Sequence, residues 1–127
     1  MIRDIGSNFS VADGLPALSR TAATYYTAAV DHALGRTAAF HISCGIWNTS
    51  FVATLQHSDD DAAADAYIDE VAGAGNDVSV TLLEAGEGEI NVPNPRERYS
   101  RLKVVVGGTN VFGVTNISGP LRTLNAQ

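Results

Sequence analysis

The chain concentrates its potential metal ligands in one acidic run, HSDDDAAADAYIDE, at residues 57–70. Aligned with an EF-hand calcium loop that begins at Asp59, the run offers carboxylates at the first, third, seventh and last ligand positions. The sixth position must turn sharply and normally holds glycine, but Ala64 stands there, and Ala63 brings no side-chain oxygen to the fifth. We therefore interpret the run as a solvated acidic loop and expect no metal site. The four carboxylates in question are Asp59, Asp61, Asp65 and Glu70.

The three histidines, His32, His41 and His57, are far apart in the sequence and form neither an HExxH nor an HxH pair. Such pairs place two imidazoles on one side of a helix or strand, where they can share a zinc ion. The histidines are therefore expected to be polar residues on strand faces.

The remaining nucleophiles and acids lack the neighbours that catalysis needs. Cys44 is the only cysteine, so no disulfide can form within the chain, and its apolar neighbours Phe40 and Ile42 predict a buried thiol. No serine stands in a GxSxG nucleophile elbow. Glu87 and Glu89 have no aromatic platform beside them of the kind that a sugar-cleaving site uses. We expect no enzyme activity, no cofactor and no catalytic residue.

Half of the eight basic residues fall in one short stretch, residues 96–103. Alternation along the predicted strand places Arg101 and Lys103 on the same face as Tyr99 and Val105. A solvated strand face explains this pattern, and so does contact with an acidic partner, because arginine and tyrosine are enriched at protein interfaces. Arg101 and Lys103 are therefore candidate partner-contact residues.

The elements that must position these residues are predicted to be short strands. Apolar residues alternate in residues 38–56 and 98–118, which is typical of antiparallel strands with one buried face. Turn signals recur about every 8–12 residues, as in sandwiches and barrels, and no long amphipathic helix is present to link parallel strands. One helical turn is predicted near residues 61–68, a turn at 86–88 and a hairpin at Gly107-Gly108. Strands are predicted at residues 24–30, 38–44, 46–56, 77–84, 89–92, 98–106 and 111–118.

Residues 1–22 are interpreted as an extended N-terminal arm ahead of a single β-sandwich domain at residues 23–127. Gly6, Gly14 and Pro16 interrupt any long strand pattern in the arm. The arm is nevertheless too apolar for a free tail, because disordered segments are poor in such residues. We expect it to become ordered by contact with other copies or with a partner. Its candidate contact residues are Ile2, Ile5, Phe9, Val11, Leu15 and Leu18.

The overall charge argues against two classes of partner. The 127-residue chain has 14 acidic and 8 basic residues, a net charge of −6. Nucleic acids and anionic membrane surfaces both attract basic segments that neutralise phosphates. The sequence contains no apolar run long enough to span a membrane, and its first residues show no signal-peptide pattern. We expect neither nucleic acid nor membrane as a partner.

Two segments carry a resemblance to a known family. FVATLQHSDD, residues 51–60, is a strand that ends in a Q-x-S-D-D turn. RYSRLKVVVGGT, residues 98–109, is a late strand with aromatic-x-R-L spacing that runs into a Gly-Gly turn. In these motifs, in layout and in length, the chain from residue 24 onward resembles small phage-encoded capsid cement, or head decoration, proteins. The loop at residues 58–77 departs from the family's usual tip, being longer and richer in alanine.

The resemblance implies both a fold and a function. The fold class it implies is all-β: an antiparallel jelly-roll-like β-sandwich of about seven or eight strands. The function it implies is that of a virion structural protein, often a homotrimer, assembled in the host cytoplasm. Such a protein binds the major capsid protein on the outer surface of an icosahedral head and holds neighbouring subunits together, with no catalytic residues.

Two other functional hypotheses compete with that of a capsid protein. The R-L-K strand spacing also occurs in phage tail proteins and carbohydrate-binding modules, so a tail or receptor-binding, lectin-like β-sandwich module is the alternative. A small β-sandwich enzyme such as a cupin would need clustered histidines and a glutamate at defined strand spacing, which the sequence lacks.

Overall fold

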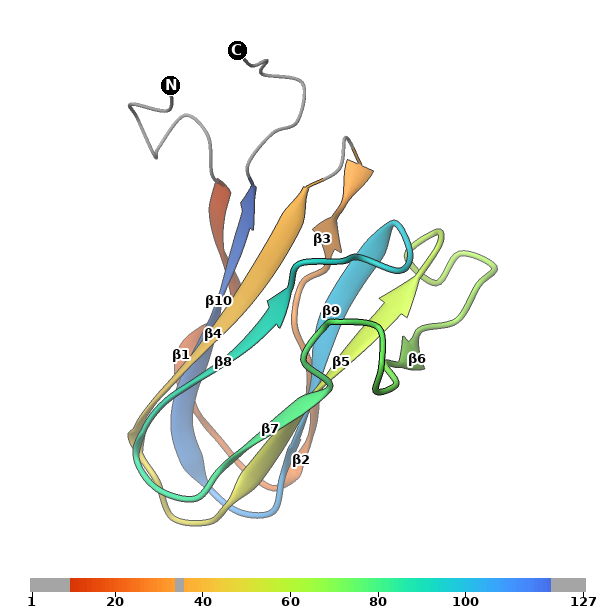
Figure 1. Ribbon diagram of the computed structural model, residues 1–127. Helices are drawn as coiled ribbons and strands as arrows, with labels where there is room; N and C mark the ends of the chain where they lie inside the picture. The colour runs from red at the N-terminus through yellow and green to blue at the C-terminus, as the bar shows by residue number, and fades with distance from the viewer. Residues whose placement is uncertain (1–9, 34–35, 120–127) are drawn as a thin grey trace, which may run out of the picture.

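The computed structural model describes residues 10–33 and 36–119 (Figure 1). Every strand pairing in these ranges is antiparallel, and the strands form two sheets. Sheet A has the order β1 (Ser10–Arg20), β10 (Asn110–Gly119), β4 (Thr37–Ile46) and β8 (Gly86–Val92). Sheet B contains β2 (Ala23–Tyr26), β3 (Val30–Asp31), β9 (Tyr99–Val106), β5 (Phe51–Ser58), β6 (Ile68–Asp69) and β7 (Ser79–Leu82).

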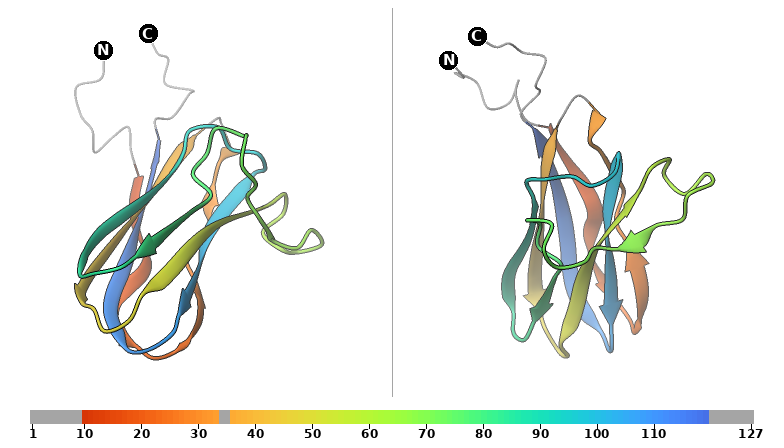
Figure 2. Two further views of the ribbon diagram at one scale, coloured as in Figure 1. Left: turned by 60° about the horizontal axis from the view of Figure 1, so that its bottom comes forward. Right: turned by 45° about the vertical axis from the view of Figure 1, so that its right-hand side comes forward.

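The strand order is that of a jelly roll. Setting aside the two-residue strands β3 and β6 leaves β1-β10-β4-β8 packed against β2-β9-β5-β7. Successive strands cross from one sheet to the other, except β5 and β7, which pair directly (Figures 1 and 2). This double-sheet arrangement of eight strands confirms the all-β, jelly-roll-like sandwich.

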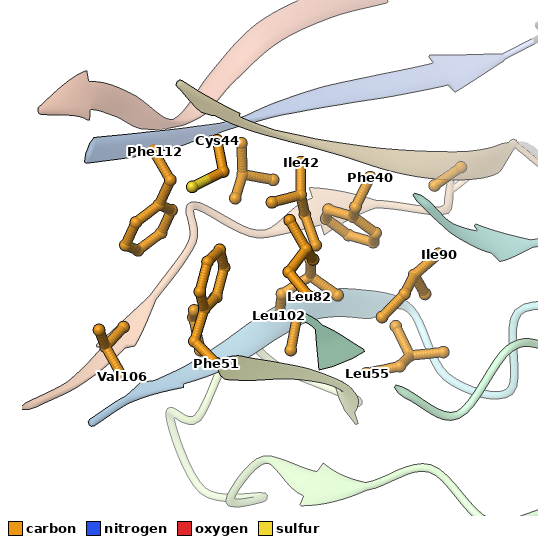
Figure 3. Packing of buried hydrophobic residues seen from close by; sticks show 14 of the residues in the cluster. Phe40, Ile42, Cys44, Phe51, Leu55, Leu82, Ile90, Leu102, Val106 and Phe112 are labelled. Carbon is orange, nitrogen blue, oxygen red and sulfur yellow. The ribbon is translucent and has the colours of Figure 1, made fainter. Parts of the chain in front are cut away.

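The core lies between the two sheets and follows the predicted alternation (Figure 3). Phe40, Ile42 and Cys44 point inward from β4, while their neighbours His41 and Ser43 face out. Each fully buried aromatic or branched side chain contributes about 1.5–3 kcal/mol through loss of water contact. The rings of Phe51 in sheet B and Phe112 in sheet A stack with centroids 4.8 Å apart, so they join the two layers.

The prediction that residues 1–22 form an arm outside the sandwich is wrong for Ser10–Arg20. These residues are β1, an edge strand that pairs with β10 from one end to the other. The register shifts around Gly14 and again before Leu18, and because of these shifts inward and outward positions do not alternate regularly along β1. Most of the strand is exposed. Buried Arg20 fixes its end by donating to the carbonyls of Phe112 and Pro16, each at 2.6 Å.

Three further local predictions are corrected. The single strand predicted at 24–30 is interrupted because Thr27 donates its N–H to Leu102 while Ala28 turns away to bond Gly14 of sheet A, both at 3.0 Å. The predicted helical turn near residues 61–68 is a series of turns, with Asp61 and Ala62 in the left-handed region at φ 56° and 68°. The turn predicted at 86–88 lies instead at residues 83–85, and Gly86 already belongs to β8.

The glycine pair Gly107-Gly108 also plays a different role from the one predicted. It does not close a hairpin, because β9 belongs to sheet B and β10 to sheet A. The connection is an arch over the end of the core (Figure 1). Gly108 lacks room for a side chain there, because an added Cβ would lie 2.8 Å from the methyl carbon of Thr49.

Candidate interaction surface

The outer face of sheet B carries an unusual concentration of tyrosine and basic side chains. We call face B the outward residues of β2, β9, β5 and β7, together with the adjoining Tyr67 and Asp69. Pairing sets them in rows, in which Tyr26 lies opposite Lys103 and Lys103 opposite Thr54, while Arg101 lies opposite Gln56. The strand residues of face B are Thr24, Tyr26, Val52, Thr54, Gln56, Ser79, Thr81, Tyr99, Arg101, Lys103 and Val105.

Arg101 is clamped at the centre of face B. Its guanidinium carbon lies 4.2 Å from the ring centroid of Tyr26 and 3.9 Å from that of Tyr67. Its Nε donates to the side-chain oxygen of Gln56 at 3.0 Å. Two rings and one hydrogen bond thus restrict a side chain that is normally free to rotate, which lowers the entropy cost of any further bond it makes.

The terminal nitrogens of Arg101 remain available. Neither Nη atom has a hydrogen-bond partner among the described residues, and neither is shut away from solvent. A guanidinium offers five N–H donors in a planar fork, and only Nε–H is engaged here. The residue therefore presents a fixed pair of free donors to the outside.

Polar neighbours hold the second basic residue, Lys103, beside this fork. Gln56 donates from its amide to Asp69 at 2.9 Å, and Lys103 Nζ lies 3.4 Å from the same carboxylate. The hydrogen bond from Gln56, followed by the charge of Lys103, lowers the pKa of Asp69, so its carboxylate stays ionised. Face B is thus a connected network rather than a set of independent side chains.

Tyr67 is also held at its hydroxyl end. Its hydroxyl donates to Asp61 at 2.6 Å. Burial, followed by the hydrogen bond and the charge of Asp61, raises the pKa of Tyr67 well above its ordinary value. The side chain therefore stays a neutral phenol. Through it, the loop between β5 and β6 contacts the edge of face B.

The candidate contact residues from the sequence divide between the two sheets. Arg101 and Lys103 lie together on face B, as predicted. Val11, Leu15 and Leu18 lie on β1 at the edge of sheet A, where Val11 and Leu18 are exposed and Leu15 packs against the core. Ile2, Ile5 and Phe9 lie outside the described residues.

The outer face of sheet A, which we call face A, has the opposite charge. Its outward positions include Asp13, His41, Glu87 and Glu89, and His41 Nε2 lies 3.5 Å from a carboxylate oxygen of Glu87. Small residues leave a shallow hollow of about 300 Å³ in this face. The hollow is lined in part by Ala17, Ser43, Gly45, Gly113 and Thr115.

A second polar network occupies the end of the sandwich beyond face B. His57, at the end of β5, is buried between Glu97, which its Nδ1 contacts, and Glu70, whose oxygen is 3.8 Å from Nε2. Burial raises the pKa of Glu70, but hydrogen bonds from Asn76 and the Val71 N–H outweigh it, and the pKa is lowered. The network joins β5 to the loop before β9 and has a structural role.

The acidic run does not adopt the calcium-loop arrangement. Asp61 bonds Tyr67, and Glu70 is turned inward to Arg96 at 3.1 Å. Asp59 and Asp65 instead approach Glu97, with oxygens within 4.8 Å of one another. The hydrogen bond from His57 lowers the pKa of Glu97, but burial and the two aspartates outweigh it and raise the pKa. The three carboxylates are crowded, and nothing beyond this crowding points to a cation.

The remaining candidate groups are buried in structural positions. Cys44 is 3 % exposed and points into the core, and burial raises the pKa of its thiol. His32 is not a polar residue on a strand face, as the sequence suggested, but is buried, with Nε2 2.6 Å from the Ser100 hydroxyl and Nδ1 3.0 Å from the Arg36 carbonyl.

One comparison with known proteins supports the fold, and none shows a family. No family model matches the chain, and no curated protein matches it in sequence. Among solved structures, the chain is similar to one from work on Bacillus endospore appendages, which form a family of disulfide-linked pili. The TM-score is 0.52 and the identity 7 %, over 95 % of this chain and 96 % of that chain. At this identity the likeness shows a shared β fold, which spans almost the whole of both chains.

Proposed function

We propose that this protein is a virion structural subunit that binds the outer surface of an icosahedral phage head and stabilises contacts between major capsid subunits. The observation that carries the proposal is face B, an exposed sheet surface centred on a clamped arginine and two tyrosines. Arginine and tyrosine are the residues that most often anchor protein interfaces. A cement protein needs such a surface and no catalytic site.

The two segments that resemble capsid cement proteins meet in this surface. FVATLQHSDD forms β5 and its turn, and RYSRLKVVVGGT forms β9 and its arch. The two strands lie side by side in sheet B, paired from Phe51–Val106 to Ser58–Tyr99. Segments that are distant in sequence therefore build one continuous face, which supports a shared role in docking.

The edges of the sheets favour contact through faces over addition of a strand. β1 is interrupted by Pro16 and by two shifts of register, and β2 and β7 are each four residues long. At β8, the other edge of sheet A, the backbone N–H and carbonyl of Asn91 are already bonded to Asp77. Prolines, irregular pairing and short strands are how proteins prevent their sheet edges from pairing with other chains. The major capsid protein is the proposed partner, and a homotrimer on the outer capsid surface would multiply each weak contact.

The test is quantitative mass spectrometry of purified particles of the virus that encodes the chain. We expect the protein in a fixed ratio to the major capsid protein in intact particles and in isolated heads, and its absence from isolated tails. Particles stripped of it should lose DNA at a lower temperature and recover on its return. Its presence in tails alone would support the receptor-binding alternative and overturn the head proposal.

A second candidate function is a subunit of a pilus-like polymer, which the likeness to the endospore appendage structure favours. That structure comes from disulfide-linked pili, whereas the single cysteine here is 3 % exposed. A polymer of this chain would therefore have to form without Cys44. Electron microscopy of the pure protein distinguishes the two, because a polymer subunit assembles filaments alone and a cement protein does not.

A further inference from the structure

We propose that Arg101 and Lys103 form a preorganised receptor for an acidic side chain of the major capsid protein, and that face B is therefore the side that docks on the head. The inference rests on the proposed function and names the surface and the chemistry of the contact. The occupant is an Asp or Glu carboxylate on the capsid surface, whose two oxygens accept hydrogen bonds from the two terminal nitrogens of Arg101 while Lys103 lies beside it.

The geometry of Arg101 suits a carboxylate. Its two terminal nitrogens have no partner among the described residues, and the plane of the guanidinium is set by Tyr26, Tyr67 and Gln56. A carboxylate presents two oxygens at the spacing of two parallel N–H groups, which gives a bidentate, charge-assisted pair. Because the fork is already held in place, little conformational entropy is lost when the pair forms.

Three other arginines of the described residues are already engaged. Arg20 is bonded to backbone carbonyls, Arg96 pairs with buried Glu70, and Arg98 binds both oxygens of Asp31 at 3.0 and 2.9 Å. Each of these has an evident structural partner within the chain. Arg101 differs because its stacking partners orient it and leave its charge uncompensated at the terminal nitrogens.

Lys103 adds a second positive charge, which favours a carboxylate over a nucleic acid as the ligand. It lies on the same strand face as Arg101, and its contact with Asp69 at 3.4 Å leaves further ammonium donors free. Two basic residues suit one or two carboxylates but not the extended phosphates of a nucleic acid, which require a broad basic surface. The chain's net charge of −6 opposes such polyanions as well.

The first test measures binding of full-length variants to heads stripped of the protein. Arg101→Lys keeps the charge and removes the fork, and Arg101→Gln removes both. We expect each to weaken head binding by at least about tenfold, in the range seen for paired charges at interfaces, and high salt to weaken the wild type in parallel. Arg98→Lys is the matched control and should bind like the wild type, with folding of every variant checked by circular dichroism.

The second test uses the fact that Lys103 is the only lysine in the chain. A carbodiimide joins an amine directly to a carboxylate in contact with it, so treatment of decorated heads should link Lys103 to an Asp or Glu of the major capsid protein. The free protein should give at most the internal link to Asp69, and Lys103→Arg should abolish both. Mass spectrometry identifies the joined peptides, and the result does not depend on how the Arg101 variants fold.

The outcomes separate the two proposals. A wild-type protein that fails to bind stripped heads refutes the proposed function. A wild-type protein that binds, while Arg101→Lys binds equally well or Lys103 yields no link to the capsid, overturns this inference and leaves the proposed function standing.

Discussion

Face A and face B are built by the same strand geometry but offer different chemistry to a partner. Each is the outward half of an alternating sheet whose inward half fills the common core. Face A carries Asp13, Glu87 and Glu89, together with a hollow lined in part by small residues. Face B carries tyrosines, Arg101 and Lys103, tied together by stacking and hydrogen bonds.

The difference shows that outward residues are free to vary once the core is satisfied. Acidic side chains on face A are exposed to water, and their negative charge would repel an acidic partner. The ordered side chains of face B have already lost rotamer freedom, so their cost of binding is reduced. Under the proposed function, face B is therefore the side suited to an acidic partner surface.

The largest expected effect comes from placing the same carboxylate on each face. Thr54 of β5 lies opposite Lys103 on face B, and Thr115 of β10 lies opposite His41 on face A. Thr54→Glu would compete for Lys103 and repel the partner's carboxylate, and we expect head binding to fall on the order of a hundredfold. Thr115→Glu should bind within about threefold of the wild type, because a surface substitution outside the contact changes little. Equal losses from both variants would refute a single docking face.

The second effect concerns stability and is confined to face A. A Cβ added at Gly113 would lie 2.9 Å from the Ala17 backbone nitrogen and 3.0 Å from the Leu15 carbonyl oxygen, so β1 would have to move. We expect Gly113→Ala to lower the free energy of unfolding by about 1–3 kcal/mol, as overpacking does. Gly45→Ala, on the same face with no atom within 4 Å of the new Cβ, is the control and should change it by less than about 0.5 kcal/mol. Urea unfolding measures both, and a Gly113→Ala protein as stable as the control would contradict the packing of β1.

The smallest expected effect is a pH dependence at the end of sheet B, where His32 packs under β9. Burial lowers the pKa of His32, although the Arg36 carbonyl and Asp31 act in the opposite direction. The unfolded chain therefore takes up a proton before the folded one, and stability falls as pH drops below about 6.5, by at most about 1.4 kcal/mol per pH unit. His32→Gln should flatten this slope in thermal unfolding between about pH 7.5 and about pH 5.5, one unit either side of the ordinary histidine pKa. An unchanged slope would assign the pH dependence to another group.

The sequence was informative wherever a segment alternates strictly. Phe40, Ile42 and Cys44 on one side of β4, and Leu102, Val104 and Val106 on one side of β9, were predictable because a strand's side chains point to opposite faces in turn. The crossing at Gly107-Gly108 was not, because a short glycine turn fits an arch between sheets as well as a hairpin. β1 was missed because its shifts of register break the alternation.

The candidate site was predictable only in part. Arg101 and Lys103 share a face by alternation alone, so the sequence placed them together. Tyr26 and Tyr67 were missed as their partners, because the three residues of the clamp come from β2, β9 and the loop before β6. In the sequence, each of these tyrosines shows only as an outward residue near the end of a strand. Which residue it contacts is decided by long-range strand pairing.

The central claim is that the protein lies on a phage head with face B against the capsid, and a cryo-electron microscopy map of the decorated particle tests it most directly. The account predicts density for the sandwich on the outer capsid surface, with Arg101 and Lys103 at the contact and Glu87 and Glu89 facing solvent. A map in which face A meets the capsid, or in which the head carries no such density, would contradict it.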